Sequence, residues 1–174
     1  MLHLFCPDFC CEYITDISIN WLKDNKVTTI ILDVDNTLLP WNANVPTVAN
    51  VEWIKSLKSE GFRLILLSNN GGKRLKEICD HVKLPAVGWA AKPFSLGFKR
   101  ALHALEIKER GEVLVIGDQI ITDVFGAKKM GMKVMLVESL SQKEFIATRL
   151  TRKVERVVIK KLKKKGLMPK GGKK

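Results

Sequence analysis

Residue types suited to phosphate chemistry follow apolar segments at four places in the chain. They are carboxylates, hydroxyls, an amide and one lysine: Asp33, Asp35, Thr37, Ser68, Asn69, Lys92, Asp118 and Asp123. Carboxylates that lie close together repel each other unless a cation sits among them. Hard oxygen ligands favour Mg²⁺, which completes its shell with water and substrate phosphate. A hydroxyl can donate to a phosphate oxygen, and a lysine can neutralise the phosphate charge, so the set predicts Mg²⁺-assisted phosphoryl transfer.

Each of these groups also has a plainer structural explanation. Asp-Asn-Thr at 35–37 and Ser-Asn-Asn at 68–70 are good turn and helix-capping sequences. One such loop is more often a cap than a site. Four such loops in sequence order, together with a suitably placed lysine, favour a site.

Strand-like and helix-like segments alternate along the chain and must position these groups. Apolar, β-branched runs at 27–34, 62–67, 112–116 and 132–137, with a shorter one near 87–90, are typical of buried strands. Helical spacing predicts helices at 45–59, 73–81, 95–106 and 122–130. This alternation indicates right-handed βαβ units, and the predicted fold class is α/β: a three-layer sandwich with a parallel, Rossmann-like sheet.

The chemistry-bearing residues fall at the carboxyl ends of the predicted strands. In open parallel sheets, function lies in the loops beyond those ends. The first strand delivers Asp33 and Asp35, which would share one face if the strand stayed regular. We therefore expect the loops to converge on a single site.

The four motifs together resemble those of the haloacid dehalogenase (HAD) superfamily. The strings are DVDNT, LLSNN, AAKP and GDQIITD, in that order. The resemblance implies that Asp33 is the nucleophile, forming an aspartyl-phosphate, and that Asp35 protonates the leaving oxygen and then activates water. These two roles require Asp33 to stay ionised beside the metal and Asp35 to be protonated for part of the cycle.

The resemblance also implies a ligand for each remaining group. Mg²⁺ would be held by the carboxylates of Asp33 and Asp118 and by the main-chain carbonyl of Asp35, with Asp123 as a further metal-shell acid. Ser68 and Lys92 match the phosphate-binding positions of the second and third motifs, and we expect Thr37 and Asn69 to bind the phosphate beside them. The Asn69 and Asn70 pair is also placed where it can orient the substrate.

The spacing of the motifs leaves no room for a cap domain. Between Thr37 and Phe62 one helix and its loops fit, and between Asn70 and Lys92 one helix and one short strand fit. A site without a cap is open to a large or surface-bound substrate. The chain resembles the YqeG-type branch of HAD subclass IIIA, related to phosphatidylglycerophosphate phosphatases, from its opening LFCPDF to TRKVERVVIKKLKKKGL. This resemblance implies dephosphorylation of phosphatidylglycerophosphate to phosphatidylglycerol at the membrane surface.

The charge of the chain is concentrated at its end. The formal net charge is +12, yet residues 149–174 hold twelve basic residues against one acid, Glu155, which leaves residues 1–148 at +1. We expect a capless phosphatase domain at 1–140, with 1–26 as its N-terminal lead-in. A basic amphipathic helix and a Lys/Gly tail follow at 141–174.

Three explanations of the basic tail remain open. Its apolar stripe could pack on the domain and leave the charges in water. It could bind an anionic membrane surface as a peripheral contact, since each lysine or arginine near such a surface adds about 1 kcal/mol. It could instead bind nucleic acid, although the tail has no aromatic residue to stack a single-stranded base.

The start of the chain has neither a secretory nor a mitochondrial targeting pattern, which predicts a cytoplasmic protein, with peripheral contact to the inner membrane surface if the tail binds lipid. The four cysteines are expected to be free thiols, with a metal site at 3–11 as a weaker alternative. Two alternative functions remain open: hydrolysis of a soluble nucleotide or sugar phosphate, and an RNA- or ribosome-binding scaffold that uses the tail.

Overall fold

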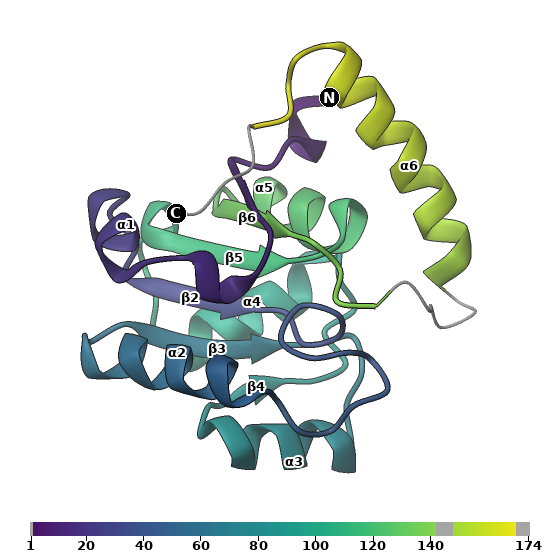
Figure 1. Cartoon of the computed structure of the whole chain (residues 1–174). Helices are drawn as coiled ribbons and strands as arrows, with labels where there is room; N and C mark the ends of the chain where they lie inside the picture. Colours follow the sequence, from purple (N-terminus) through teal and green to yellow (C-terminus); the bar gives the residue numbers. More distant parts are fainter. Residues whose placement is uncertain (1, 142–147, 170–174) are drawn as a thin grey trace.

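Six parallel strands form one sheet in the computed structural model of the chain, which describes residues 2–141 and 148–169 (Figure 1). The strands are β1 (Phe9–Cys11), β2 (Thr29–Leu32), β3 (Arg63–Leu67), β4 (Ala86–Val87), β5 (Val113–Gly117) and β6 (Lys133–Val137). Their order in the sheet is β1-β6-β5-β2-β3-β4. The predicted parallel α/β fold is confirmed.

Helices connect the strands and cover both faces of the sheet. They are α1 (Ile19–Asp24), α2 (Val48–Ser59), α3 (Lys73–Val82), α4 (Ser95–Ala104), α5 (Phe125–Lys129) and α6 (Thr148–Lys164). Short turns complete the chain: η1 (Leu2–Phe5), η2 (Ile14–Asp16), η3 (Arg110–Glu112) and a π-helical turn, η4 (Ile120–Val124).

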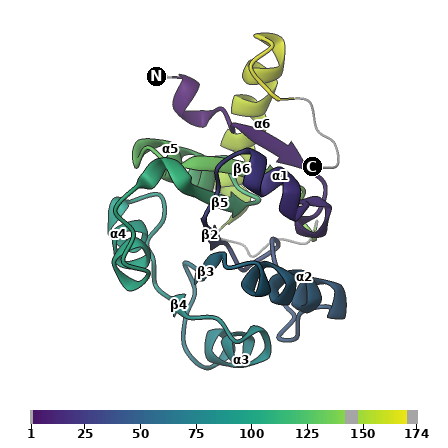
Figure 2. The same ribbon diagram turned by 90° about the vertical axis from the view of Figure 1, so that its left-hand side faces the viewer.

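Two apolar cores make the sandwich, one on each face of the sheet. Leu22 of α1, Ile54 of α2 and Ile78 of α3 belong to one buried cluster, and Phe98 of α4 and Ala127 of α5 belong to the other. Viewed along the sheet, α1 and α2 lie on one side and α4 and α5 on the other (Figure 2). The central strands are apolar on both faces, as expected when helices cover both sides of a parallel sheet.

The direction of chain winding reverses between β2 and β5. From β2 the chain proceeds outward to β3 and β4, then returns to place β5 on the other side of β2 and continues to β6. In open parallel sheets such a reversal separates the loops and leaves a crevice at the carboxyl ends. Asp33 follows β2 and Asp118 follows β5, so both residues lie at this crevice.

The chain between the strands leaves no inserted domain in the part that the structure describes. The segment from β2 to β3 holds only α2 and its loops, and the segment from β3 to α4 holds only α3 and β4. The sequence-based expectation of a capless fold agrees with this architecture.

Several predicted boundaries differ from the observed ones for local reasons. The second helix begins at Val48 rather than Val45, because Thr47 caps it by accepting a hydrogen bond from the Asn50 amide at 3.2 Å. The short fourth strand is Ala86–Val87 rather than 87–90, because Trp89 has a φ of +50° and turns the chain away. The helix predicted at 122–130 is a π-helical turn followed by α5.

The lead-in at 1–26 is more than a connector. Its β1 strand pairs with β6 at the edge of the sheet, Phe9 against Met135, and α1 covers part of one face. The Asp8 carboxylate fixes the start of this pairing, since it accepts from the Val134 amide at 2.9 Å. Neither element was predicted from the sequence.

Helix α6 lies on the carboxyl side of the sheet (Figure 1). Leu162 and Glu155 are buried, and Val158 and Ile159 pack against the core that α4 and α5 cover. Its described lysines, at 160, 161, 163 and 164, are exposed. The helix thus packs through an apolar stripe, while residues 142–147 of the predicted amphipathic segment lie outside the described residues. The structure likewise does not describe the side chains of Arg149, Leu150, Arg152, Lys153, Val154 and Arg156.

No helix among the described residues is both long enough and apolar enough to cross a bilayer.

Candidate active site

Three acids and one lysine form a buried cluster at the crevice. Asp33 stands directly after β2, and its amide donates to the Ile116 carbonyl of β5 at 2.9 Å, which fixes its place between the two strands. The Lys92 ammonium contacts one carboxylate oxygen of Asp33 and one of Asp123, each at 2.6 Å. All three side chains are at least nine-tenths buried. A desolvated arrangement of this kind persists only because the charges are paired.

The loop after β5 supplies the other two acids. Asp118 follows Gly117, and η4 carries Asp123 back toward the sheet, where its second oxygen accepts from the Gln119 amide at 3.1 Å. A Cβ at Gly117 would collide with the Asp123 carboxyl group. Gly117 therefore allows the close approach that places Asp123 beside Lys92.

This acid cluster has the composition of a divalent-cation site. One carboxylate oxygen from each of Asp33, Asp118 and Asp123 lies within 4.8 Å of the other two. When all three acids are ionised, their closely placed negative charges repel one another, and Lys92 supplies one opposing positive charge. A hard divalent cation with oxygen ligands would neutralise them, so the residues fit the predicted metal.

Electrostatics within the cluster favour charge neutralisation. Burial raises the pKa of Asp33 most strongly, the Lys92 ammonium opposes that rise, and the carboxylates of Asp123 and Asp118 add to it, with a net pKa of about 8. Burial by itself lowers the pKa of Lys92, but Asp123 and Asp33 outweigh it and hold that pKa above its usual value. Lys92 therefore stays charged, and a cation beside Asp33 would favour its ionised form.

Thr37 has a polar atom available for a ligand. Its side chain is 2% exposed, and its hydroxyl oxygen makes no hydrogen bond within the described part of the chain. A buried hydroxyl without a partner costs free energy, and such groups are concentrated where a ligand or water binds. Its position suits the predicted phosphate contact, which stays a prediction.

Asp35 lies outside the acid cluster and has partners of its own. β2 ends at Leu32 and Asn36 takes a left-handed φ of +63°, so the first motif does not continue the regular strand. Arg74 of α3 donates to one Asp35 oxygen at 2.7 Å, and the Asn70 side chain donates to the other at 2.8 Å. Asp33 and Asp35 were expected to share one face only if the strand stayed regular, and β2 ends before both residues. A metal contact through the Asp35 carbonyl stays a prediction.

Ser68 lies beside the Asp35 carboxylate. It is buried, and its hydroxyl accepts from the Asn70 amide at 3.0 Å and lies 3.4 Å from an Asp35 oxygen. The hydroxyl hydrogen can rotate toward a phosphate because its present acceptor is distant.

The Asn69 side chain links the loop after β3 to the main chain of Lys92. Its side-chain oxygen accepts from the Lys92 amide at 2.7 Å, and its side-chain nitrogen donates to the Lys92 carbonyl at 3.1 Å. Both polar ends of the amide are used, which favours a role in positioning Lys92 over direct phosphate contact. The predicted phosphate contact of Asn69 stays a prediction.

Helix α6 reaches the same site through Glu155. This carboxylate is 2% exposed and accepts from the Ile121 amide at 3.0 Å. Ile121 belongs to η4, the turn that joins Asp118 to Asp123. The one acid of the basic segment is therefore buried against the loop that carries two of the clustered acids.

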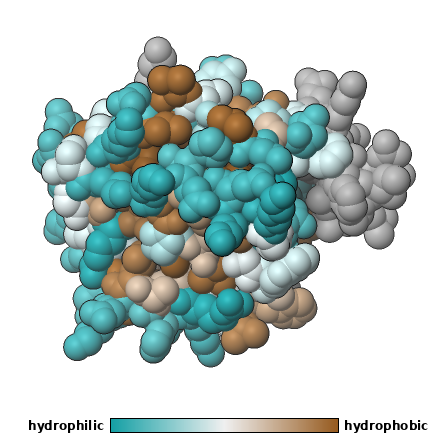
Figure 3. Space-filling view, turned by 90° about the horizontal axis from the view of Figure 1, so that it is seen from below, coloured by the Kyte–Doolittle hydropathy of each residue, from teal (hydrophilic) through white to brown (hydrophobic). Residues whose placement is uncertain are grey.

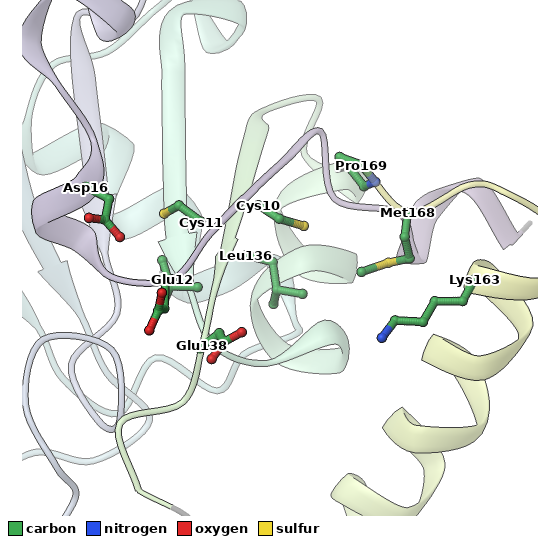
Figure 4. Close-up of a pocket in the computed structure, with 10 residues that line it drawn as sticks. Cys10, Cys11, Glu12, Asp16, Leu136, Glu138, Lys163, Met168 and Pro169 are labelled. Carbon is green, nitrogen blue, oxygen red and sulfur yellow. The ribbon is translucent and has the colours of Figure 1, made fainter. Parts of the chain in front are cut away.

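A separate cavity of about 570 Å³ lies between the β1–β6 edge and α6 and does not include the acid cluster. Glu12 and Glu138 line it on the sheet side, and Lys163 points toward it from α6 (Figure 4). Cys10 and Cys11 also line it, and all four cysteines are free thiols. Within the described residues, the acid cluster is the only group with the composition and geometry of a metal site.

Two residues of the site were missed from the sequence, although each left a signal there. Arg74 lies in the first turn of a helix, where a cation interacts unfavourably with the helix dipole. A cation at this position therefore indicates a role other than stabilising the helix. Glu155 is the one acid at 149–174, and it stands three, four and seven residues before the apolar Val158, Ile159 and Leu162. That spacing places it on the packed face of the helix.

Comparison with known proteins agrees with this site. Residues 89–162, from the third motif to α6, match the family model of HAD-like hydrolases. The chain is also 35% identical over 162 residues to the probable phosphatase YqeG of Bacillus subtilis (strain 168), covering 93% of this chain and 94% of that protein. The chain therefore belongs to the haloacid dehalogenase family of hydrolases. Within that family it is a phosphatase of the kind that YqeG represents.

More distant relatives share the chemistry or the fold. The glyceraldehyde 3-phosphate phosphatase of Pyrococcus abyssi is 29% identical over 116 residues, 62% of this chain and 48% of that protein. A HAD-superfamily hydrolase from Ehrlichia chaffeensis superposes with a TM-score of 0.52 at 16% identity, covering 77% of this chain and 97% of that one. A haloacid dehalogenase-like hydrolase from Brucella suis gives 0.50 at 13% identity, over 71% and 92%. The last two show the common fold.

Proposed function

We propose that this phosphatase hydrolyses phosphate monoesters through a phosphoaspartyl intermediate on Asp33, with Mg²⁺ held by Asp33, Asp118 and Asp123. The observation that carries the proposal is the buried cluster of these three acids with Lys92, beside a separately held Asp35. When bound, the cation would neutralise the acids and polarise the phosphoryl oxygens.

Two displacements complete the proposed reaction. The Asp33 carboxylate attacks phosphorus and forms an O–P bond, the ester O–P bond breaks, and the leaving oxygen takes a proton from Asp35. Asp35, now ionised, removes a proton from water, and the water oxygen attacks phosphorus and releases inorganic phosphate from Asp33. Lys92, Ser68 and Thr37 neutralise or donate to the phosphoryl oxygens throughout.

The proposed substrate is phosphatidylglycerophosphate, which would be converted to phosphatidylglycerol at a membrane surface. Three features support this choice: the likeness of the chain to the YqeG-type branch, a site without an inserted cap among the described residues, and a basic helix beside the site. The exposed lysines at 160, 161 and 163–165 would meet the anionic surface. Each would add about 1 kcal/mol near such a surface.

The lipid assignment is tested with vesicles that contain phosphatidylglycerophosphate, in the presence of Mg²⁺. We expect wild type to release inorganic phosphate about 10³-fold or more faster than Asp33→Asn, because the variant lacks the nucleophile. Equal rates for the two proteins on this lipid, with a clear difference on a soluble ester, would reject the lipid and keep the chemistry.

A soluble phosphate ester is the second candidate substrate, favoured by the likeness to glyceraldehyde 3-phosphate phosphatases. The discriminating variant replaces the five exposed lysines at 160, 161 and 163–165 by glutamine. This variant keeps Glu155 on the Ile121 amide, which deletion of the whole segment would remove. Under the lipid proposal, the variant is less active on vesicles than wild type. Under the second candidate, both proteins are more active on soluble esters than on vesicles, and the variant is as active on soluble esters as wild type.

A further inference from the structure

Trp89 has a strained main-chain conformation and an exposed side chain, and neither feature stabilises the folded protein. Its φ of +50° lies in the left-handed region, where a bulky side chain is a genuine outlier, and 69% of its surface is exposed. Strained residues of this kind are concentrated at ligand sites, where function compensates for their cost. Its position, three residues before Lys92, places it at the border of the active site.

The strained segment is tied directly to the second motif. The Trp89 amide donates to the Asn70 carbonyl at 3.3 Å, and the Ala90 amide donates to the Ser68 carbonyl at 3.0 Å. The indole lies over Gly71, where any Cβ would collide with the ring. The loop therefore holds the indole against the main chain that follows Ser68, Asn69 and Asn70.

A shallow groove of about 420 Å³ opens beside this indole, between α3 and the β4 edge of the sheet. Leu75, Leu84, Pro85 and Trp89 supply apolar lining, while Lys76 and Arg100 add two cations. Seen from below, this side of the molecule mixes apolar and polar surface (Figure 3). Gly71 and Gly72 line the groove, and they follow the predicted phosphate-binding loop at 68–70 directly in sequence.

We infer that this groove binds the apolar part of an anionic phosphate ester while the phosphate lies at the acid cluster. The inference rests on the proposed function, because it places the phosphate beside Asp33, Ser68 and Lys92. The apolar lining suits the hydrocarbon part of such an ester, and the flanking cations suit its negative charge. Trp89 is the main contact for its first methylene groups, since the indole combines a large apolar face with a polar edge.

A series of alkyl phosphates tests the groove without reference to any natural lipid. Ethyl, butyl, hexyl and octyl phosphate are hydrolysed with Mg²⁺ at concentrations below those at which they aggregate. In wild type, kcat/KM rises with chain length by about two- to fourfold for each methylene that enters the groove. The rise is expected mainly in KM, because the chain is remote from the reacting phosphorus.

Three variants make the test specific. In Trp89→Ala the ratio of octyl to ethyl kcat/KM falls at least tenfold below that of wild type, and Trp89→Phe restores part of it. Tyr13→Ala removes another exposed aromatic residue, which follows β1 at the opposite edge of the sheet from β4. This variant keeps the wild-type ratio. Since each ratio is taken within one protein sample, partial loss of folded protein cancels.

The outcomes separate this inference from the proposed function. If wild type hydrolyses all four esters at the same kcat/KM, or if Trp89→Ala keeps the full chain-length dependence, the groove is not the binding site. If Asp33→Asn hydrolyses the esters as fast as wild type, the proposed catalytic site fails instead.

Discussion

The guanidinium of Arg74 and the carboxylate of Asp35 form an ion pair of 2.7 Å at the edge of the acid cluster. The same guanidinium donates to the main-chain carbonyl of Ala43 at 2.9 Å and lies 3.4 Å from that of Pro40. Arg74 thus fixes the proposed general acid and the loop after it in one arrangement. In a fold with no inserted cap among its described residues, α3 performs this positioning.

Arg74→Ala is expected to lower kcat for alkyl phosphates by about 10- to 100-fold, because Asp35 is no longer held in its working position. The loss should be smaller for p-nitrophenyl phosphate, whose leaving group needs little protonation. Steady-state rates on both esters measure the difference. Lys73→Ala is the matched control, since the neighbouring Lys73 side chain is 92% exposed. An equal loss on both esters would show that Arg74 does not act through Asp35.

Asp118→Asn is expected to weaken Mg²⁺ binding by about tenfold or more, which is about 1.4 kcal/mol or more. The variant removes one of three clustered carboxylates and keeps its size. Thermal unfolding during a Mg²⁺ titration measures the effect, because a ligand that binds only the folded state raises Tm. Asp80→Asn, an exposed acid on α3, serves as the control. Unchanged Mg²⁺ stabilisation in Asp118→Asn would remove this residue from the metal site.

The raised pKa of Asp33 predicts how the metal-free protein responds to pH. Its ordinary value is 3.8 and its value in the fold is about 8, so folding favours the protonated form. The stabilisation is present at low pH and is lost as pH rises from about 4 toward 8. Metal-free Asp33→Asn should lack this decline and have a higher Tm than wild type at pH 8, by about 2–4 °C for each kcal/mol relieved. Parallel Tm curves for the two proteins from pH 5 to 9 would contradict the assignment.

Glu155→Ala is expected to destabilise the protein by about 1–3 kcal/mol, because the Ile121 amide loses its acceptor. It should also weaken Mg²⁺ binding, since that amide belongs to the turn between Asp118 and Asp123. Glu155→Gln, which retains an acceptor oxygen, should recover part of both losses. Val157→Ala is the control on the same helix, with a side chain that is 55% exposed. Loss of stability without any change in Mg²⁺ affinity would limit Glu155 to packing.

The central part of this molecule could be predicted because two independent patterns agreed. Apolar runs gave the inner strands, and polar residues at their ends gave Asp33, Ser68 and Asp118. The topology of a parallel sheet then brings such residues together whatever their separation in sequence. The place of Asp123 at the metal was expected only from the resemblance of the fourth motif to that of the HAD superfamily.

The strand and the contacts that were not predicted from the sequence depend on partners that are distant in sequence. β1 has three residues and no periodicity of its own, and it exists because β6 offers an unpaired edge. The ion pair between Arg74 and Asp35 requires α3 to pack beside the first loop. The separate partners of Asp33 and Asp35, which are Lys92 and Arg74, come from other loops and helices that a strand pattern does not reveal.

The pairing of β1 with β6 also determines the order in which this chain can be completed. Asp8 and its partner Val134 are 126 residues apart, so a growing chain carries its first strand without a neighbour until nearly all the sheet has been made. Of the six strands, β1 is therefore synthesised first and is expected to join the sheet last, and the β6 edge stays uncovered until it does.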